Sequence, residues 1–318
     1  MALLAIDLGA TKLASAVFTE DGSMISEKSV QLDGRKGIEV GALISSQVKS
    51  ILDEKHADGD DILSIGVCVP GISFQAKGTV WAPNIPGWDE YPLLAEIRET
   101  TGGIPVAIDS DRSCCILGEL WEGAAQGCRD AIFLAVGTGI GAGILVDGKV
   151  LRGSHDIAGA VGWMALERSY QSKFDECGNF ETRASGNGIA KLAREVLIAA
   201  NDYEGPLKSI GETDLTAHDI FRAYDEGDPI ATEVLRQCVE FWGMAVANLV
   251  SLFNPEKIIF GGGVFGPAIR FIPAIHAEAM KWAQPISMKQ VTIEPSSLGN
   301  HAALFGAGLL ALQNSSTE

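Results

Sequence analysis

An apolar run at the start of the chain ends at Asp7, and a turn with the sequence GATK follows at residues 9–12. This pattern predicts a strand, a tight turn and a return strand over residues 12–19. Such a turn offers backbone N–H groups, a hydroxyl and an ammonium, and Asp7 could hold a cation beside them. These groups suit a polyphosphate with its Mg²⁺. The same residues also fit an ordinary glycine-containing hairpin, because short glycine motifs match often.

Two further glycine-rich turns follow apolar strands. A strand predicted over 131–136 leads into GTG at 137–139, and a strand over 257–260 leads into GGG at 261–263. The first of them repeats the opening design, because its turn leads into an Ala/Gly-rich return strand over 141–146. This repeat predicts an internal duplication, in which two lobes each present a phosphate-facing hairpin to a shared cleft.

Asp111 is the candidate general base. It follows a strand predicted over 106–108 and precedes a helix predicted over 112–125, where the cleft of such a fold would lie. A carboxylate there can accept the proton of a hydroxyl that attacks a phosphate. Alternatively, Asp111 only caps the helix. Asp109 could serve as that cap nearly as well, so capping alone does not explain two acids.

The remaining elements alternate between strands and helices after the antiparallel start, which predicts the α/β class. Apolar residues at helical spacing predict further helices at 36–55, 93–100, 184–200, 217–224, 229–253, 267–282 and 300–312. Strands are expected at 24–32, 62–69 and 290–293. Residues 152–185 are polar and predicted to be irregular.

Composition excludes several classes of function. A chain of 318 residues suggests two lobes, and a net charge of −17 argues against nucleic acid and anionic membranes as partners. The chain opens without a basic leader, and its longest apolar run, 131–146, is short and broken by glycines, so a cytoplasmic protein is expected. The six cysteines form no CxxC pair and are expected to be reduced thiols.

The three glycine turns in this order resemble the two-lobed actin-like ATPase (ribonuclease H-like) fold, and within it the ROK family of repressors and sugar kinases. The resemblance covers nearly the whole chain. Its motifs are the turn at 7–12, PNIPGW at 83–88, DSD at 109–111 with LGE at 117–119, GTGIG at 137–141 and IFGGGV at 259–264. It implies a small lobe, 1–112, completed by a C-terminal helix at about 300–318, and a large lobe, 113–299.

For the phosphate donor, the resemblance implies ATP and Mg²⁺. Asp7 would hold Mg²⁺, and Asp111 would be the catalytic base. The residues implied to line the nucleotide are Gly9, Ala10, Thr11, Lys12, Thr138, Gly139, Gly262 and Gly263. Each glycine could instead serve a left-handed turn position, and the lysine could simply be solvated.

The acceptor side departs from the family pattern HGxxGExGH, because residues 155–163 read HDIAGAVGW. Ala160 stands where the family has a sugar-contacting Glu, and Trp163 stands where it has the second His. The family's cysteine-rich zinc segment is also missing. The aligned positions are Ser172, Phe174 and Asn179, so with Trp163 all four ligands are absent and no zinc site is expected.

Acceptor contacts are expected from Asn84, Ser110, Asp111, His155, Ala160, Trp163 and Glu181. Ser110 replaces the family's usual Asn. Hydrogen bonds to charged groups are worth about 1.5–3 kcal/mol each, so losing a carboxylate and an imidazole should weaken glucose recognition. Trp163 could stack on an apolar sugar face, or it could fill space left by the zinc segment.

These residues predict an ATP-dependent kinase for a sugar or sugar derivative other than plain glucose, with amino, acetamido or deoxy sugars as candidates. A sugar-responsive regulator is the second reading. ROK repressors carry an N-terminal helix-turn-helix, whereas the phosphate hairpin here begins at residue 2. A third is a sugar-binding protein without activity, against which Asp7, Lys12 and Asp111 argue. Family members are commonly dimers, so a homodimer is expected.

Overall fold

Two five-stranded sheets form the framework of the computed structural model, which describes residues 1–57, 61–211 and 214–315. The first sheet has the order β3-β2-β1-β4-β7, with bounds Met24–Gln31, Lys12–Phe18, Ala2–Leu8, Ile62–Val69 and Val106–Ser110. The second has the order β10-β9-β8-β11-β12, with bounds Lys149–Val150, Ile140–Val146, Ala131–Val136, Lys257–Gly261 and Thr292–Pro295.

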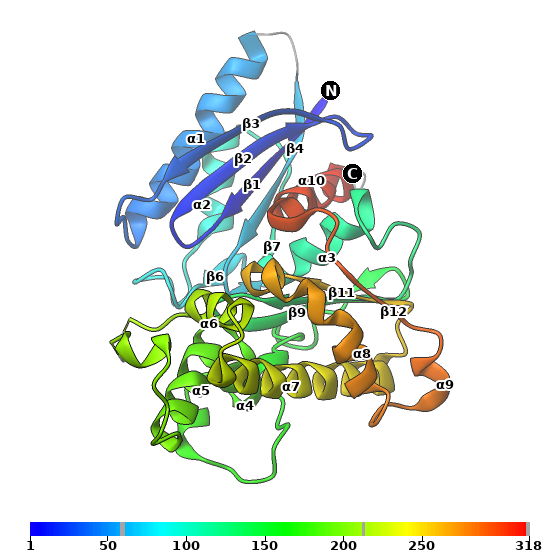
Figure 1. The fold of residues 1–318 in the computed structure, drawn as a ribbon. Coiled ribbons are helices and arrows are strands. Elements are labelled where there is room, and N and C mark those ends of the chain that lie inside the picture. The colour runs from blue at the N-terminus through cyan, green and yellow to red at the C-terminus, as the bar shows by residue number, and fades with distance from the viewer. Residues whose placement is uncertain (58–60, 212–213, 316–318) are drawn as a thin grey trace.

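The two sheets have the same topology. In each, the central strand pairs antiparallel with the next strand of its hairpin and parallel with a strand that arrives later in the chain. This confirms the predicted internal duplication. Figure 1 shows the first sheet above the second, with α3 (Asp111–Glu122) and α10 (Ala302–Ser315) between them.

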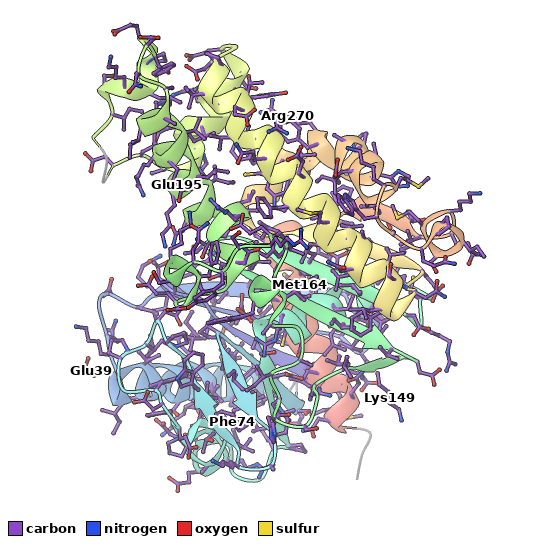
Figure 2. The ribbon with its side chains drawn as sticks, turned by 90° about the horizontal axis from the view of Figure 1, so that it is seen from below. Glu39, Phe74, Lys149, Met164, Glu195 and Arg270 are labelled. Carbon is purple, nitrogen blue, oxygen red and sulfur yellow. The ribbon has the colours of Figure 1, made fainter. Side chains whose placement is uncertain are left out.

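Each sheet buries both faces, which explains why its central strands are apolar throughout. In β1, Leu4 and Ile6 pack with residues of α1 (Ile38–Ala57) and α2 (Leu93–Thr101), while Leu3 and Ala5 pack with α3 and α10. In β8, the even-numbered residues face the long helix α7 (Pro229–Phe253), and Phe133 faces α3. Seen from below, α7 crosses in front of the second sheet (Figure 2).

Several sequence predictions are confirmed within a residue or two, and α7 has the predicted bounds. The predicted helix at 267–282 is confirmed as an α-helix only over 272–279. A 3-10 helix, η5 (Pro267–Phe271), precedes α8 (Ile272–Ala279), because Pro273 has no N–H to carry the hydrogen-bond ladder across the junction. The segment 152–185 is also more regular than predicted, since α4 (Asn179–Ala184) ends it. A short hairpin, β5 (Ile72–Phe74) and β6 (Thr79–Trp81), was not predicted.

The packing of α3 and α10 between the sheets depends on glycines at the points of closest approach. A Cβ placed on Gly306 of α10 would lie 1.7 Å from the carbonyl oxygen of Cys114 in α3. A Cβ on Gly66 of β4 would lie 1.9 Å from the carbonyl oxygen of Ala307. Because both obstacles are backbone atoms, a side chain at either position would push the layers apart.

The predicted lobe limits, 1–112 and 113–299, stay a prediction.

No helix within the described ranges is long and apolar enough to cross a membrane.

We expect Gly306→Ala to lower the free energy of unfolding by about 1–3 kcal/mol or more, because the added methyl group overpacks a backbone contact that cannot relax locally. Chemical denaturation of the purified variant measures this. A variant as stable as the parent would mean that α3 and α10 can separate without cost.

Candidate active site

Acidic side chains gather at the carboxyl ends of the parallel strands of the first sheet. Asp7 in β1 pairs with Cys68 in β4, and Cys68 pairs with Asp109 in β7. Asp111 follows as the first residue of α3. The structure therefore brings the predicted metal-holding and base residues to one edge of one sheet.

The electrostatics of Asp7 and Asp111 reflect this crowding. Burial raises the pKa of Asp7, while a hydrogen bond from Cys68 and the charge of Lys12 lower it. Asp111 reaches solvent, yet desolvation by the protein packed around it raises its pKa, the Arg112 guanidinium opposes the shift, and the Asp7 charge adds to it. Two carboxylates close enough for the charge of Asp7 to raise the pKa of Asp111 are chemically suited to a divalent cation.

The turn at 9–12 is exposed beside these acids. The Gly9 N–H donates to the Lys12 carbonyl at 2.9 Å, which closes the turn, and the Leu32 N–H donates to the Thr11 carbonyl at 2.8 Å. Ala10, Thr11 and Lys12 are solvent-accessible. The predicted phosphate turn thus forms as a hairpin turn and faces outward.

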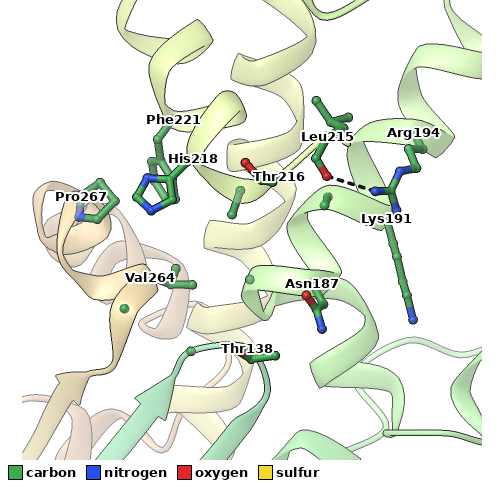
Figure 3. A pocket seen from close by; sticks show the side chains of 15 residues that line it. Thr138, Asn187, Lys191, Arg194, Leu215, Thr216, His218, Phe221, Val264 and Pro267 are labelled. Atoms are coloured by element: carbon green, nitrogen blue, oxygen red, sulfur yellow. Dashed lines mark hydrogen bonds between the residues drawn. The ribbon is translucent and has the colours of Figure 1, made fainter. Parts of the chain in front are cut away.

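A pocket of about 600 Å³ lies on the side of the second sheet (Figure 3). Thr138 and Gly263, two of the predicted nucleotide residues, line it. The remaining wall comes from α5 (Gly186–Ala199), α6 (Ala217–Asp225) and the segment after β11, and includes Asn187, Lys191, Arg194, His218, Phe221, Val264 and Pro267. Sequence reasoning missed Asn187, Lys191, Arg194, His218 and Phe221, because they lie on helices predicted only from their apolar faces.

The two predicted glycines after β11 differ in their surroundings. Gly262 has φ +86°, and a Cβ there would lie 2.5 Å from the Val136 carbonyl oxygen, so this position needs glycine for the turn itself. No atom lies within 4 Å of a Cβ placed on Gly263. Since Gly263 lines the pocket, a side chain there would enter it.

Glu181, one of the predicted acceptor residues, lies close to this pocket. From α4, its carboxylate accepts the Ile140 N–H at 2.6 Å and lies close to Gly139 and Gly162. Burial raises the pKa of Glu181, and the charge of Lys191, which lines the pocket, is among the effects that lower it. Glu181 therefore lies at the start of β9, and one of its carboxylate oxygens already accepts a hydrogen bond.

The structure does not bring all the other predicted acceptor residues next to Glu181. Ser110 is buried, and its hydroxyl shares a hydrogen bond with Ser113 at 3.0 Å. Asn84 and His155 are exposed, and Ala160 immediately precedes a 3-10 turn over Val161–Trp163. Trp163 is 57% exposed and lines a separate pocket. Their roles toward an acceptor stay predictions.

Two arginines join the loop 152–160 to the junction between β7 and α3. Arg152 forms an ion pair with Asp109, which is 3% exposed. In the reverse direction, Arg112 donates to the carbonyl oxygens of Ala158 at 3.1 Å and Asp156 at 3.2 Å, and also to Gly71 at 3.3 Å. The loop that carries His155 and Ala160 is thereby tied to the strand end that carries Asp111.

In place of a zinc segment, residues 163–183 are held by hydrogen bonds and ion pairs. Arg183 pairs with Glu167 and Glu195, and its guanidinium lies 5.6 Å from the centre of the Phe174 ring. All six cysteines are free. In the part of the chain that the structure describes, no three His, Cys, Asp or Glu side chains form a group that could hold a metal ion.

The duplicated sheets, the acids at one strand edge and the pocket beside the second turn define an actin-like ATPase fold. A model of the ROK family matches residues 3–314, so the chain belongs to the ROK family. It is 31% identical over 315 residues to a glucokinase from Halalkalibacterium halodurans, covering 97% of this chain and 94% of the relative.

Two further relatives have names that state different functions, one an enzyme and the other a regulator. A ROK family glucokinase from Streptomyces griseus, solved in complex with glucose and AMPPNP, has a TM-score of 0.76 and 26% identity, with 98% of this chain and 100% of that chain covered. A xylose repressor from Caldicellulosiruptor bescii is 28% identical over 96% of this chain and 76% of its own length. The family thus includes enzymes and regulators.

We expect Arg152→Met and Arg112→Met to destabilise the protein to different degrees. The first leaves the buried Asp109 without its cation and should lower the free energy of unfolding by about 3 kcal/mol. The second removes hydrogen bonds to neutral carbonyls and a positive charge beside the exposed Asp111, and should cost about 1–2 kcal/mol. Chemical denaturation measures both.

Hydrogen exchange tests the anchoring directly, since amides of 153–160 should exchange faster in both variants. Arg98→Met, at an exposed position on α2, is the control and should alter neither quantity. Unchanged exchange of the loop in Arg112→Met would show that the arginine does not hold it.

Proposed function

We propose that the protein is an ATP-dependent kinase that phosphorylates a hydroxyl of a sugar or sugar derivative. The observation that carries this proposal is the placement of Asp111 at the head of α3, beside Asp7 and the exposed turn at 9–12, in a fold whose other half offers a 600 Å³ pocket. Membership of the ROK family, and a relative solved with glucose and an ATP analogue, support it.

In this proposal the adenosine occupies the pocket. Apolar groups on one side of it, Phe221 of α6 and Val264 and Pro267 after β11, suit a face of a base. Thr138 and Lys191 line the same pocket and carry donors for phosphate oxygens (Figure 3). The phosphates then extend toward the turn at 9–12, where backbone N–H groups and Lys12 receive them.

Asp7 is the residue that would hold Mg²⁺, and the cation would neutralise charge on the phosphates. The two carboxylates at this edge fit such an ion, because the charge of Asp7 disfavours the charge of Asp111 and a cation would offset it. Asp111 accepts the proton of the attacking hydroxyl. Burial raises its pKa toward the working range of a general base, and the charge of Arg112 opposes that shift.

We propose that the acceptor is not plain glucose. Ala160 offers a methyl group where the family has a carboxylate, and one oxygen of Glu181 already accepts the Ile140 N–H. Fewer charged groups therefore remain to recognise a full set of hydroxyls. Amino, acetamido and deoxy sugars are the candidates.

A sugar-binding regulator without turnover is the alternative, in keeping with the xylose repressor among the relatives.

Asp111→Asn tests the proposed base. The amide keeps an oxygen for the Arg112 N–H, which Asp111 now accepts at 2.7 Å, so the fold should persist. We expect turnover to fall by about 10²–10⁴-fold while nucleotide binding remains, because only proton transfer is lost. ADP release over a panel of sugars measures turnover.

Asp89→Asn, at an exposed position, is the matched control and should retain the parent's turnover. If Asp111→Asn turns over like the parent, Asp111 is not the base. If none of the sugars in the panel supports ADP release by the parent, the kinase proposal fails. The sugar-binding regulator then remains as the function.

Gly263→Leu tests the nucleotide pocket. Its side chain would enter open space in the pocket, so we expect the KM for ATP to rise at least about ten-fold, or 1.4 kcal/mol, without loss of stability. Gly262→Ala is the comparison and should lose stability, because of its positive φ and the nearby Val136 carbonyl. An unchanged KM for ATP in Gly263→Leu would place the nucleotide elsewhere.

A further inference from the structure

The middle of the loop 152–160 turns one side chain inward. The residues at 154, 155 and 157 are exposed, whereas Asp156 is half-buried. Asp156 also has φ +59°, a left-handed conformation that residues other than glycine adopt uncommonly. The family pattern HGxxGExGH has glycine at this position. The chain therefore carries a charged side chain at a point where the backbone conformation favours glycine.

The Asp156 carboxylate bonds to a segment that belongs with the other sheet. Its Oδ2 accepts the Gln75 N–H at 3.1 Å, across 81 residues of sequence. Gln75 lies in the turn between β5 and β6, which follows β4 of the first sheet. Asp156 lies after β10 of the second sheet. One hydrogen bond to a carboxylate therefore joins a loop of one half of the fold to a turn of the other.

The turn that carries Gln75 is itself fixed to β7. The Gln75 Nε2 donates to the Ile108 carbonyl oxygen at 2.8 Å and to the Ser73 hydroxyl oxygen at 3.1 Å. The Ser73 hydroxyl donates to the same Ile108 carbonyl at 3.1 Å. Because β7 ends at Ser110, directly before Asp111, a loop bonded to the Gln75 N–H is positioned relative to the proposed base.

The other contacts of the loop do not depend on the side chain at position 156. Arg112 donates to the carbonyl oxygens of Asp156 and Ala158, and the Ala158 N–H donates to the Arg152 carbonyl at 3.0 Å. These acceptors belong to the backbone, so they remain whichever residue stands at 156. A substitution of Asp156 therefore removes the bond to Gln75 and leaves these anchors in place.

We propose that Asp156 is a positioning residue that holds the loop 152–160 in its acceptor-binding conformation before the acceptor binds. This inference rests on the proposed kinase function. The Asp156 carboxylate acts through the loop, which carries His155 and Ala160, and does not itself contact the acceptor. A loop that is already ordered loses less conformational entropy when the acceptor binds, so the acceptor binds more tightly. Glycine at 156 would relieve the backbone strain but would leave the middle of the loop free.

Asp156→Gly tests this role, because glycine suits the φ of the position and removes only the carboxylate. We expect the KM for the best acceptor in the sugar panel to rise about three- to ten-fold, as the loss of one hydrogen bond to a charged group allows. The kcat and the KM for ATP should stay within about two-fold of the parent's, since proton transfer and the nucleotide pocket are untouched.

Two further variants separate positioning from other effects of the substitution. Asp156→Asn keeps an oxygen for the Gln75 N–H and tolerates the left-handed conformation, so its KM for the acceptor should lie nearer to the parent's than to that of Asp156→Gly. Asp147→Gly is the matched control. It makes the same change at φ +53°, in the turn between β9 and β10, and removes a carboxylate paired with Arg129, so the KM for the acceptor should not change.

Hydrogen exchange reports on the loop without turnover. In Asp156→Gly, the amides of Gln75 and of residues 153–157 should exchange faster than in the parent, while those of α3 should not change. The acceptor should slow exchange of the loop more in this variant than in the parent, because the parent's loop is ordered already. Unchanged exchange of the Gln75 and loop amides would overturn the inference.

The kinetic outcomes are equally decisive. An unchanged KM for the acceptor in Asp156→Gly, an equal rise in the KM for ATP, or an Asp156→Asn variant no better than Asp156→Gly would overturn the inference. If no sugar supports ADP release, the kinase proposal has failed, and calorimetric titration with the same sugars decides the role of Asp156. A Kd about three- to ten-fold weaker in Asp156→Gly supports it. An equal Kd in both proteins, or no binding by the parent, overturns it.

Discussion

The contact of α3 with its neighbours through backbone atoms is the constraint on which the candidate site depends. Gly306 lets α10 approach α3, Gly66 lets β4 approach α10, and a Cβ on Gly143 of β9 would lie 2.0 Å from the Arg112 carbonyl oxygen. Four elements, β4, α10, α3 and β9, are thereby held at backbone distance, and the head of α3 is fixed relative to both sheets. Asp111 sits at that head, so the packing of the core sets the position of the proposed base.

The two arginines extend this rigid junction to the loop that carries the predicted acceptor residues His155 and Ala160. Arg112 begins on α3 and reaches the loop 152–160, while Arg152 begins on that loop and reaches Asp109. The Gln75 N–H, from the first-sheet half, also donates to the Asp156 carboxylate at 3.1 Å. The loop 152–160 is therefore fixed to the β7–α3 junction. The pocket at Thr138, which we propose binds the nucleotide, is built instead from α5, α6 and the segment after β11.

Much of the fold was predictable from the sequence, because apolar strands ending in glycine turns carry a strong local signal. The repeat of Asp7–Lys12 at 137–143 predicted the duplication, and apolar residues at helical spacing predicted α7, which in the structure begins at Pro229 with Asp228 as its N-cap. The break at Pro273 was missed, since apolar spacing alone continues through it. The walls of the nucleotide pocket were missed too, because residues such as His218 and Lys191 meet only through tertiary packing. For the same reason, sequence alone could not indicate that Trp163 lines a pocket of its own, separate from the one at Thr138.

The central claim is that a nucleotide in the 600 Å³ pocket directs its terminal phosphate toward Asp111. A crystal structure with a non-hydrolysable ATP analogue and Mg²⁺ tests it most directly. The account predicts the base against Phe221 and Pro267, the phosphates between Thr138 and the turn at 9–12, and Mg²⁺ beside Asp7. A nucleotide bound outside this pocket, or with its terminal phosphate directed away from Asp111, would contradict it.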